Sequence, residues 1–283
     1  MSELTRRIIF AVIAAPLAIA VVYFGDWALA IMLSVLAALA AWEFFRMARE
    51  TGLFPLEPAG ISIAALLPIA IHAQRRGVYN LSLTALVAIA LLLFASTIWL
   101  RGPAGKPLGS VAVTAFGVLY AGQFAYIYAL RYHDYAVGAA AGTALVLLPV
   151  LLTWATDIGA YAIGRSIGRR KLIPTVSPGK TVEGALGGLA IAIIVCLLYV
   201  RFILMPLAHL ALTIQGAVLF AIVVSVAAQT GDLAESLLKR EAGIKDSSRI
   251  IPGHGGVLDR FDSLLFVMPI AFLVLGRLLL PVP

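Results

Sequence analysis

Carboxylates, basic side chains and glycines gather between residues 229 and 262 of an otherwise apolar chain. Asp232 and Glu235 lie three residues apart, so on a helix they share one face with Ser236 and Lys239. Two carboxylates one turn apart are costly in apolar surroundings unless a cation compensates them. Hard oxygen ligands favour Mg²⁺, which commonly joins carboxylates to substrate phosphates. The spacing therefore predicts a metal and phosphate site; the alternative is a solvated helix end with one Glu235–Lys239 pair.

A glycine-rich loop with a second acidic pair follows. Three glycines around His254 permit positive φ values and close backbone approach, which suits N–H groups that meet an anion. Asp259 and Asp262 are again three residues apart, at the start of the last apolar segment. A second acidic pair facing the first could hold a metal between two helices and aim it at a triphosphate. The alternative for His254 is a structural role within the loop.

A third polar segment, residues 154–184, contains Ser177-Pro-Gly-Lys180-Thr181. It is not a P-loop, because Pro174 stands where that motif requires a glycine and no strand is predicted before it. The two hydroxyls and the lysine could still bind phosphate. The neighbouring basic run, residues 169–171, is typical of a cluster that faces lipid headgroups.

The composition defines the elements that must position these residues. Hydrophobic residues make up 62% and charged residues 12% of the 283 positions, whereas a soluble domain carries about 25% charged residues. Apolar runs long enough to cross about 30 Å of hydrocarbon recur along the chain. We therefore predict an all-α, polytopic integral membrane protein. About nine transmembrane helices are expected, roughly at 8–24, 27–45, 59–73, 80–100, 109–130, 137–158, 184–205, 209–229 and 263–280.

The basic residues orient this arrangement. With nine spans, sixteen of the 21 lysines and arginines fall on the side of the N-terminus, which the positive-inside rule makes the cytoplasm. Residues 1–149 are nearly all apolar and are expected to form a scaffold or lipid groove. Residues 150–283 carry acids at the ends of their spans and are expected to form the catalytic region with its cytoplasmic loops.

The residues from Ser236 to Asp262 carry a family resemblance. They follow the pattern S-x-L-K-R-x₄-K-D-x-S-x₂-I-P-x-H-G-G-V-x-D-R-F-D, which resembles the signature of phosphatidate cytidylyltransferases, also called CDP-diacylglycerol synthases. The segments from Asp157 to Arg165 and from Ser177 to Gly184 also look like those of the family. The resemblance is specific across roughly 154–263 and general in the earlier half.

The resemblance implies a reaction in which CTP and phosphatidate give CDP-diacylglycerol and pyrophosphate. It further implies a requirement for Mg²⁺, an associated second cation such as K⁺, and a homodimer. The expected place is the inner (cytoplasmic) membrane of a bacterium, where a multi-pass enzyme embedded in the lipid bilayer has its active site facing the cytoplasm. We expect no nucleic acid among the partners.

Functional roles follow by carrying the family pattern onto matching positions. Asp232 and Asp259 would hold the metal, and basic side chains around them would handle phosphates. The candidate catalytic residues are Asp232, Asp259, Lys239, Arg240, His254 and Arg260. The candidate substrate-binding residues are Asp157, Ser177, Lys180, Thr181, Glu183, Lys245, Asp246, Gly255, Gly256 and Asp262.

Two other classes of protein are considered. A secondary transporter or channel also uses intramembrane acids, but it predicts charges near the bilayer midplane and often paired repeats. Here most charges lie at cytoplasmic span ends, and no convincing repeat is present. Another lipid–nucleotide enzyme, such as a CTP-dependent polyprenol kinase or a CDP-alcohol phosphotransferase, is the second alternative. The Asp-Gly-x₂-Ala-Arg run of the latter family is absent.

Overall fold

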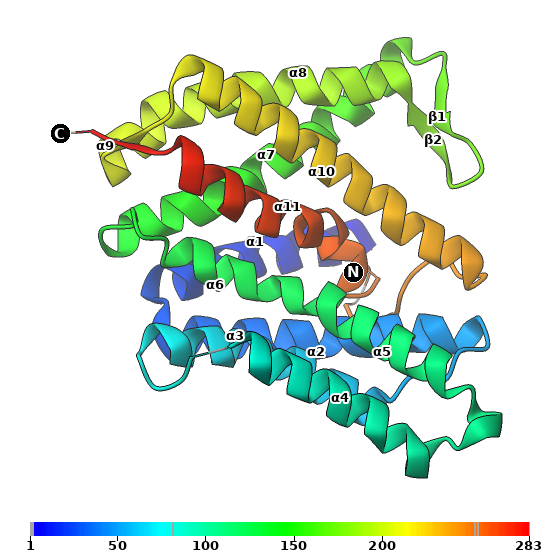
Figure 1. Cartoon of the computed structure of the whole chain (residues 1–283). Helices are drawn as coiled ribbons and strands as arrows, with labels where there is room; N and C mark the ends of the chain where they lie inside the picture. The colour runs from blue at the N-terminus through cyan, green and yellow to red at the C-terminus, as the bar shows by residue number, and fades with distance from the viewer. Residues whose placement is uncertain (1–2, 81, 252, 254, 283) are drawn as a thin grey trace. The chain divides into compact units, whose positions relative to one another are not determined.

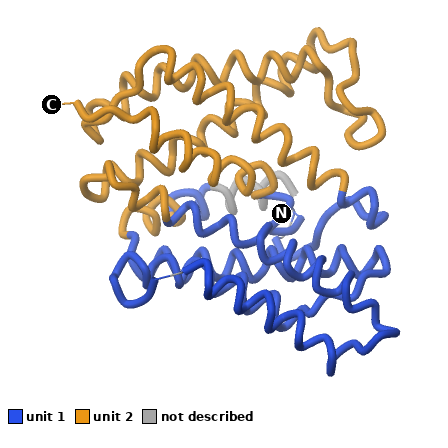
Figure 2. The backbone as a smooth tube through the Cα atoms, in the orientation of Figure 1, with its two compact units in different colours: residues 1–16, 25–128, 238–260 blue, residues 17–24, 129–237, 261–283 orange. Residues whose placement is uncertain are grey.

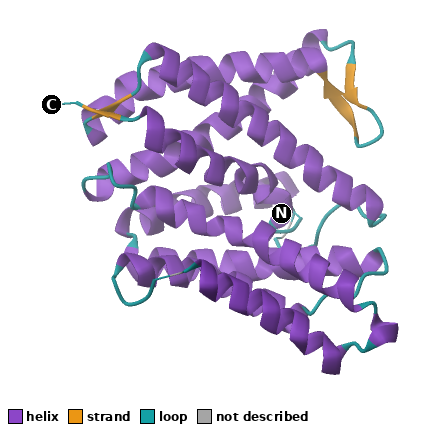
Figure 3. Cartoon of the chain, in the orientation of Figure 1, coloured by secondary structure: helices purple, strands orange, loops and turns teal. Residues whose placement is uncertain are grey.

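The structure, a computed structural model, describes residues 3–80, 82–251, 253 and 255–282, with side chains from residue 12 onward. Helices dominate the described residues (Figure 3). The strands of the described residues form two short antiparallel pairs. In one, β1 (Lys171–Ile173) pairs with β2 (Ser177–Thr181), and in the other, β3 (Leu210–Ala211) pairs with β4 (Leu280–Pro281). The predicted all-α class is confirmed.

Figure 1 labels the main helices along the chain. The α-helices are α1 (Glu3–Phe24), α2 (Asp26–Glu50), α3 (Glu57–Arg75), α4 (Leu83–Leu100), α5 (Pro107–Ala121), α6 (Ala125–Arg131), α7 (Gly138–Ile167), α8 (Val182–Tyr199), α9 (Met205–Ala208), α10 (Ile214–Glu241) and α11 (Leu258–Leu278). Short 3₁₀ turns at Pro103–Gly105 and Gly122–Phe124 flank α5, and a π-helical turn at Val200–Leu204 joins α8 to α9.

Seven helical stretches of the described chain are long and apolar enough to cross a membrane. They are Asp26–Glu50, Leu83–Leu100, Pro107–Arg131, Gly138–Ile167, Val182–Ala208, Ile214–Glu241 and Leu258–Leu278, and each matches a predicted span. The protein is therefore a polytopic helical membrane protein. The predicted first span is represented by the shorter apolar helix Val12–Phe24, and α3 covers the predicted third. The count of nine and the cytoplasmic N-terminus stay predictions.

The chain forms two compact units that are not contiguous in sequence (Figure 2). Unit 1 contains residues 1–16, 25–128 and 238–260, and unit 2 contains residues 17–24, 129–237 and 261–283. The end of α10 and the glycine-rich loop thus belong to the same unit as the early helices. The predicted functional division at residue 149 stays a prediction.

Unit 1 is built on the buried face of α2. Phe45 is fully buried and packs where Gly60 of α3 and Gly117 of α5 leave room for its ring, because a methyl group at either glycine would overlap it. Two residues earlier along this helix lies Glu43, whose side chain is also fully buried. A buried acid among these apolar residues requires hydrogen-bond donors that reach its carboxylate.

Unit 2 is built on a close antiparallel pairing of α7 with α8. Small residues form the seam: a Cβ at Gly188 would lie 2.5 Å from the Thr156 carbonyl oxygen, and one at Gly184 would lie 2.7 Å from the Ala160 carbonyl oxygen. Glycines at such positions let two membrane helices approach closely. This seam fixes the end of α7 beside the β1–β2 hairpin, which leads into α8.

Two helices extend further than the apolar pattern indicates. The sixth predicted span ends at residue 158, whereas α7 continues to Ile167, and the eighth ends at residue 229, whereas α10 continues to Glu241. Hydropathy identifies only the apolar part of a helix. No proline or turn signal follows directly after residue 158 or residue 229, so both helices continue beyond the predicted ends of their spans. The extensions carry Tyr161, Arg165 and Asp232, whereas Asp157 lies just before the predicted end of the sixth span.

Candidate functional site

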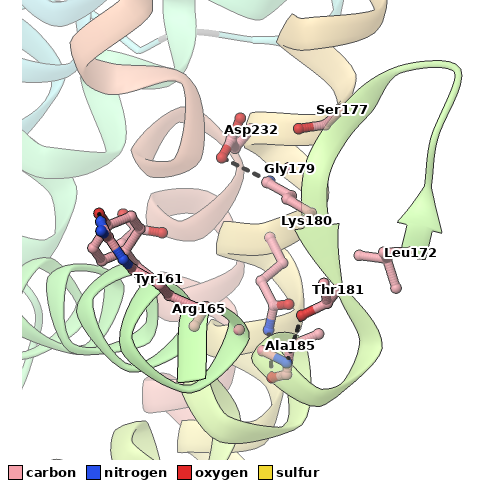
Figure 4. A pocket seen from close by; sticks show the side chains of 14 residues that line it. Tyr161, Arg165, Leu172, Ser177, Gly179, Lys180, Thr181, Ala185 and Asp232 are labelled. Atoms are coloured by element: carbon pink, nitrogen blue, oxygen red, sulfur yellow. Dashed lines mark hydrogen bonds and ion pairs between the residues drawn. The ribbon is translucent and has the colours of Figure 1, made fainter. Parts of the chain in front are cut away.

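A polar cavity of about 600 Å³ lies in unit 2. Four elements contribute its walls: the C-terminal part of α7, the β1–β2 hairpin, the start of α8 and the C-terminal part of α10 (Figure 4). Its lining residues with polar side chains are Asp157, Tyr161, Arg165, Ser177, Lys180, Thr181, Gln229 and Asp232. The structure thus brings together Asp157, Ser177, Lys180, Thr181 and Asp232, which the sequence names as candidates from three separate segments.

Local sequence explains how the hairpin presents its residues. Ile173 and Val176 close a turn with Pro174 at its second position, the position at which proline is favoured. Thr181 pairs with Lys171 across the hairpin and then caps α8, because its side-chain oxygen accepts the Gly184 N–H at 3.1 Å. Lys180 therefore lies near the end of a paired strand, directly before the residue that caps a membrane helix.

Glu183 fixes the other end of the hairpin. Its carboxylate accepts the backbone N–H groups of Arg169 at 3.0 Å and Arg170 at 3.1 Å. The sequence places Glu183 among the substrate-binding candidates, but its side chain is not among those lining the cavity. In this structure it anchors the segment that connects α7 to β1.

An ion pair crosses the cavity. Lys180 Nζ lies 2.6 Å from Asp232 Oδ2, and Figure 4 shows the lysine reaching from the hairpin toward α10. The Ser236 hydroxyl donates to the other oxygen of Asp232 at 3.3 Å, as the shared helix face predicts. A second carboxylate, Asp157, lines the same cavity. The lining side chains thus include two carboxylates, Asp157 and Asp232, and two cations, Lys180 and Arg165, so their formal charges balance before any substrate or metal binds.

Tyr161 and Arg165 form the wall on α7, one helical turn apart. Arg165 donates to the Tyr161 hydroxyl at 2.7 Å, and its guanidinium lies 5.9 Å from the centre of the same ring. Both side chains are exposed toward the cavity or solvent. Both residues belong to the segment from Asp157 to Arg165 that looks like the family's, and neither is among the predicted site residues.

Unit 1 contains a second polar cluster, around Asp259 in the first turn of α11. One carboxylate oxygen accepts the Lys239 ammonium at 2.8 Å. The other accepts the Ser247 N–H and hydroxyl, both at 2.9 Å, and the Gly256 N–H at 2.8 Å. Asp259 therefore organises the loop between α10 and α11 while it holds one candidate phosphate-binding lysine.

The Asp259 carboxylate shapes the glycine-rich loop, as the contacts of Gly255 and Gly256 show. Gly255 has φ +82°, and a Cβ there would lie 2.7 Å from an Asp259 oxygen, so close approach explains this glycine. The Gly256 N–H, which the sequence predicts to meet an anion, meets the Asp259 carboxylate. Lys245 and Asp246 are exposed in the same loop. His254 lies outside the described residues.

The remaining candidates lie near the ends of α10 and α11. Arg240 and Arg260 are exposed, in the last turn of α10 and the first turn of α11. Asp262 accepts the backbone N–H of Ser263 at 2.6 Å. Asp232 belongs to unit 2 and Asp259 to unit 1, and their sharing of one cation stays a prediction.

Glu43, a fully buried acid of α2, is not among the residues predicted from the sequence. A signal is present in the sequence, because Glu43 follows Ala41-Trp42 and precedes Phe44-Phe45 within a predicted span, and an acid inside a span indicates a functional site by default. Its partners lie more than 200 positions away. No local pattern could have supplied them.

The donor set of the cavity suits a hard divalent cation bound together with substrate. In the described part of the chain, no group of three or more histidine, cysteine, aspartate or glutamate side chains could hold a metal by itself. Mg²⁺ does not need such a cage, since it usually binds through one or two carboxylates, water and substrate phosphates. Asp157 and Asp232 provide two carboxylates in one cavity.

The fold and the cavity define a class: a polytopic helical membrane protein with a polar site formed by helix extensions and a hairpin. Comparison with known proteins places it more closely. The sequence profile of the cytidylyltransferase family matches residues 5–278. The chain belongs to this family.

Two curated relatives match this chain over nearly its whole length, and a third matches about half of it. The chain is 35% identical over 276 residues to a protein named phosphatidate cytidylyltransferase from Staphylococcus haemolyticus, covering 95% of this chain and 98% of the relative. It is 34% identical over 282 residues to one of the same name from Bacillus subtilis, covering 98% and 99%. A third, from Haemophilus influenzae, is 44% identical over 140 residues, covering 50% and 48%.

Proposed function

We propose that this protein transfers the cytidylyl group of CTP to phosphatidate, forming CDP-diacylglycerol and pyrophosphate. The observation that carries the proposal is the Lys180–Asp232 cavity in a chain that belongs to the cytidylyltransferase family. Full-length similarity to proteins named phosphatidate cytidylyltransferase supports both the group transferred and the lipid acceptor. The membrane helices suit a substrate with acyl chains.

The chemistry requires positioning and charge neutralisation more than proton transfer. A phosphatidate phosphate oxygen, already anionic at neutral pH, attacks the α-phosphorus of CTP in line, and the bond to the bridging oxygen of pyrophosphate breaks. A strong general base is unnecessary, so the residues must align the reactants and offset their charge. Lys180 would contribute its ammonium, and the hydroxyls of Ser177 and Thr181 offer hydrogen bonds to phosphate oxygens.

We propose that Mg²⁺ assists the reaction, held by Asp232 with Asp259 as the second ligand that the resemblance implies. When bound, Mg²⁺ would neutralise charge on the CTP phosphates and on the leaving pyrophosphate. Asp157 lines the same cavity as Asp232 and offers a further carboxylate. An entering phosphate competes with Asp232 for the Lys180 ammonium, since the two side chains are paired at 2.6 Å.

The finer setting of the enzyme belongs to the same proposal. The bias of basic residues toward one set of links supports a cytoplasmic N-terminus and a site that faces the cytoplasm. The bacterial relatives support a place in the cytoplasmic membrane. A homodimer and a second cation such as K⁺ are proposed from the family resemblance alone.

Two radiolabelled forms of CTP test the reaction directly. The purified full-length protein is incubated in detergent with Mg²⁺ and either α-³²P- or γ-³²P-CTP, and separately with phosphatidate, a polyprenol or diacylglycerol. We expect lipid-phase label only from α-³²P-CTP and only with phosphatidate. Label from γ-³²P-CTP in any lipid would indicate a kinase and overturn the proposal, as would failure of phosphatidate to accept the α-label.

A further inference from the structure

Glu43 is a buried carboxylate with no part in the reaction proposed above. It lies in α2 and is fully buried. Four donors converge on it: the hydroxyls of Ser247 and Ser248 at 3.0 and 2.5 Å, and the N–H groups of Val257 and Leu258 at 2.9 and 2.7 Å. All five residues belong to unit 1. This number of converging donors is what a buried carboxylate requires.

The two backbone donors mark the start of α11. The first N–H groups of a helix have no partner within the helix, and an anion there is stabilised by the helix dipole. Here the anion is supplied by a different transmembrane helix, α2, so Glu43 caps α11 from more than 200 positions away. The cap determines where α11 begins, and Asp259 is in its first turn.

Ser247 connects the buried acid to Asp259. Its hydroxyl oxygen lies 3.0 Å from Glu43 Oε2 and 2.9 Å from Asp259 Oδ2. The hydroxyl has one proton and can donate it to only one of the two carboxylates at a time. Both carboxylates nevertheless lie within hydrogen-bond distance of the same oxygen atom. Asp259 in turn accepts the Lys239 ammonium at 2.8 Å. A continuous series of contacts therefore runs from Glu43 through Ser247 and Asp259 to Lys239.

Gly256 shows how closely the loop approaches the acid. A Cβ at this position would overlap Glu43 Oε1 and the Ser247 hydroxyl, and would lie 2.6 Å from Glu43 Cδ. The loop between α10 and α11 is thus packed directly against the carboxylate. Its glycine serves the contact with α2 as well as any contact with substrate.

We propose that Glu43 is a positioning residue, which fixes the loop of residues 242–257 and the start of α11 so that Asp259 and Lys239 are presented in one geometry. The expected effect of Glu43 on the reaction rate rests on the proposed cytidylyl transfer. The positioning of the loop by Glu43 does not depend on that proposal. Glu43 is not among the residues that line the cavity; its contacts are with Ser247, Ser248 and the two backbone N–H groups.

Limited trypsin digestion tests the positioning without any assay of activity. Lys245 and Arg249 are exposed trypsin sites inside the loop, and cleavage there requires the loop to open locally. E43Q replaces an acceptor oxygen by an N–H₂ group that faces N–H donors, so we expect cleavage at these two sites to accelerate by about tenfold or more. E50Q, which makes the same change at an exposed position of α2, should leave the rate unchanged. Cleavage in the hairpin at Lys171 serves as an internal reference.

Steady-state kinetics separates positioning from general structural support. In E43Q we expect kcat to fall by about tenfold or more while KM for CTP changes little, and E50Q to match the wild type. S247A should lower kcat in the same direction. Because Glu43 acts partly through Ser247, the E43Q/S247A double variant should lose less than the product of the two single losses.

The outcomes distinguish this proposal from the proposed function. Unchanged loop cleavage in both E43Q and S247A would overturn the positioning, whatever the activity. If E43Q does not fold, S247A alone decides through its cleavage rate and kcat. A kcat within about twofold of wild type in S247A and, if folded, E43Q would overturn the catalytic consequence. A wild-type protein with no cytidylyl transfer would refute the proposed function, while the trypsin comparison would still test Glu43.

Discussion

Lys180 provides the most direct test of the cavity. The substitution Lys180→Ala removes the ammonium that lies 2.6 Å from Asp232 and leaves the residues that pair across the hairpin, Lys171 with Thr181 and Ile173 with Ser177, unchanged. Under the proposed function, this ammonium neutralises substrate phosphate. Under a purely structural interpretation, it only pairs with Asp232.

The two interpretations predict different magnitudes. The side chains of Lys180 and Asp232 are 26% and 34% exposed, so solvent screens their pairing and its contribution to stability is about 0.2–1 kcal/mol. Loss of a group that stabilises transition-state charge costs about 2.7–4 kcal/mol, or roughly 10²–10³-fold in kcat. Activity should therefore fall by about a hundredfold or more with a change in thermal midpoint of only a few degrees.

The assay follows α-³²P from CTP into CDP-diacylglycerol, with thermal unfolding of the same preparations measured in parallel. Lys171→Ala is the matched control, because Lys171 is an exposed lysine of the same hairpin that does not line the cavity. We expect Lys171→Ala to retain at least about half of the wild-type rate.

Two results would refute the reasoning. If Lys180→Ala retains more than about a third of the wild-type rate, a loss below about 0.7 kcal/mol, Lys180 does not stabilise the transition state. If Lys171→Ala loses as much as Lys180→Ala, the effect comes from the hairpin as a whole rather than from the cavity.

Three further predictions concern the metal and the helix seam. Asp232→Asn should abolish turnover in a folded protein; a residual rate above about a tenth of wild type, a loss below about 1.4 kcal/mol, would exclude Asp232 as a metal ligand. Removal of divalent cations with EDTA should stop the transfer and added Mg²⁺ should restore it, whereas activity that persists in EDTA would refute metal assistance. Gly188→Val should lower the free energy of unfolding, measured in detergent, by about 1–3 kcal/mol, because even the Cβ of the valine would lie 2.5 Å from the Thr156 carbonyl oxygen. The control Ala190→Val, at an exposed position of α8, should change the free energy of unfolding little.

The close packing within each unit explains why several candidates have structural partners. Asp259 holds the loop through Ser247 and Gly256, and Glu183 holds the hairpin through two backbone N–H groups. Both residues fit the family pattern, yet a sequence pattern does not separate a side chain that meets substrate from one that shapes the loop beside it. Burial and hydrogen bonds make that distinction, and they depend on tertiary structure.

The helix extensions show where hydropathy stops being informative. An apolar run ends where the chain leaves the hydrocarbon, but the helix continues as long as its backbone hydrogen bonds do. In α7 and α10 the polar continuation carries Arg165 and Asp232, and Asp157 lies one residue before the predicted end of the sixth span. Seven spans could be recognised from the sequence, whereas the surfaces that form the cavity lie largely beyond their predicted ends.

The amino-acid sequence by itself determined the helical membrane class, most of the spans and the resemblance that points to a cytidylyltransferase, because hydropathy and motif spacing are local properties of the chain. It also named Lys180 and Asp232 as candidates. Only the tertiary structure decided that these two side chains pair across a cavity, and that Glu43 of α2 holds the loop that begins some 200 residues later. Such contacts depend on how helices pack, and packing joins positions whose separation along the chain carries no signal of their proximity.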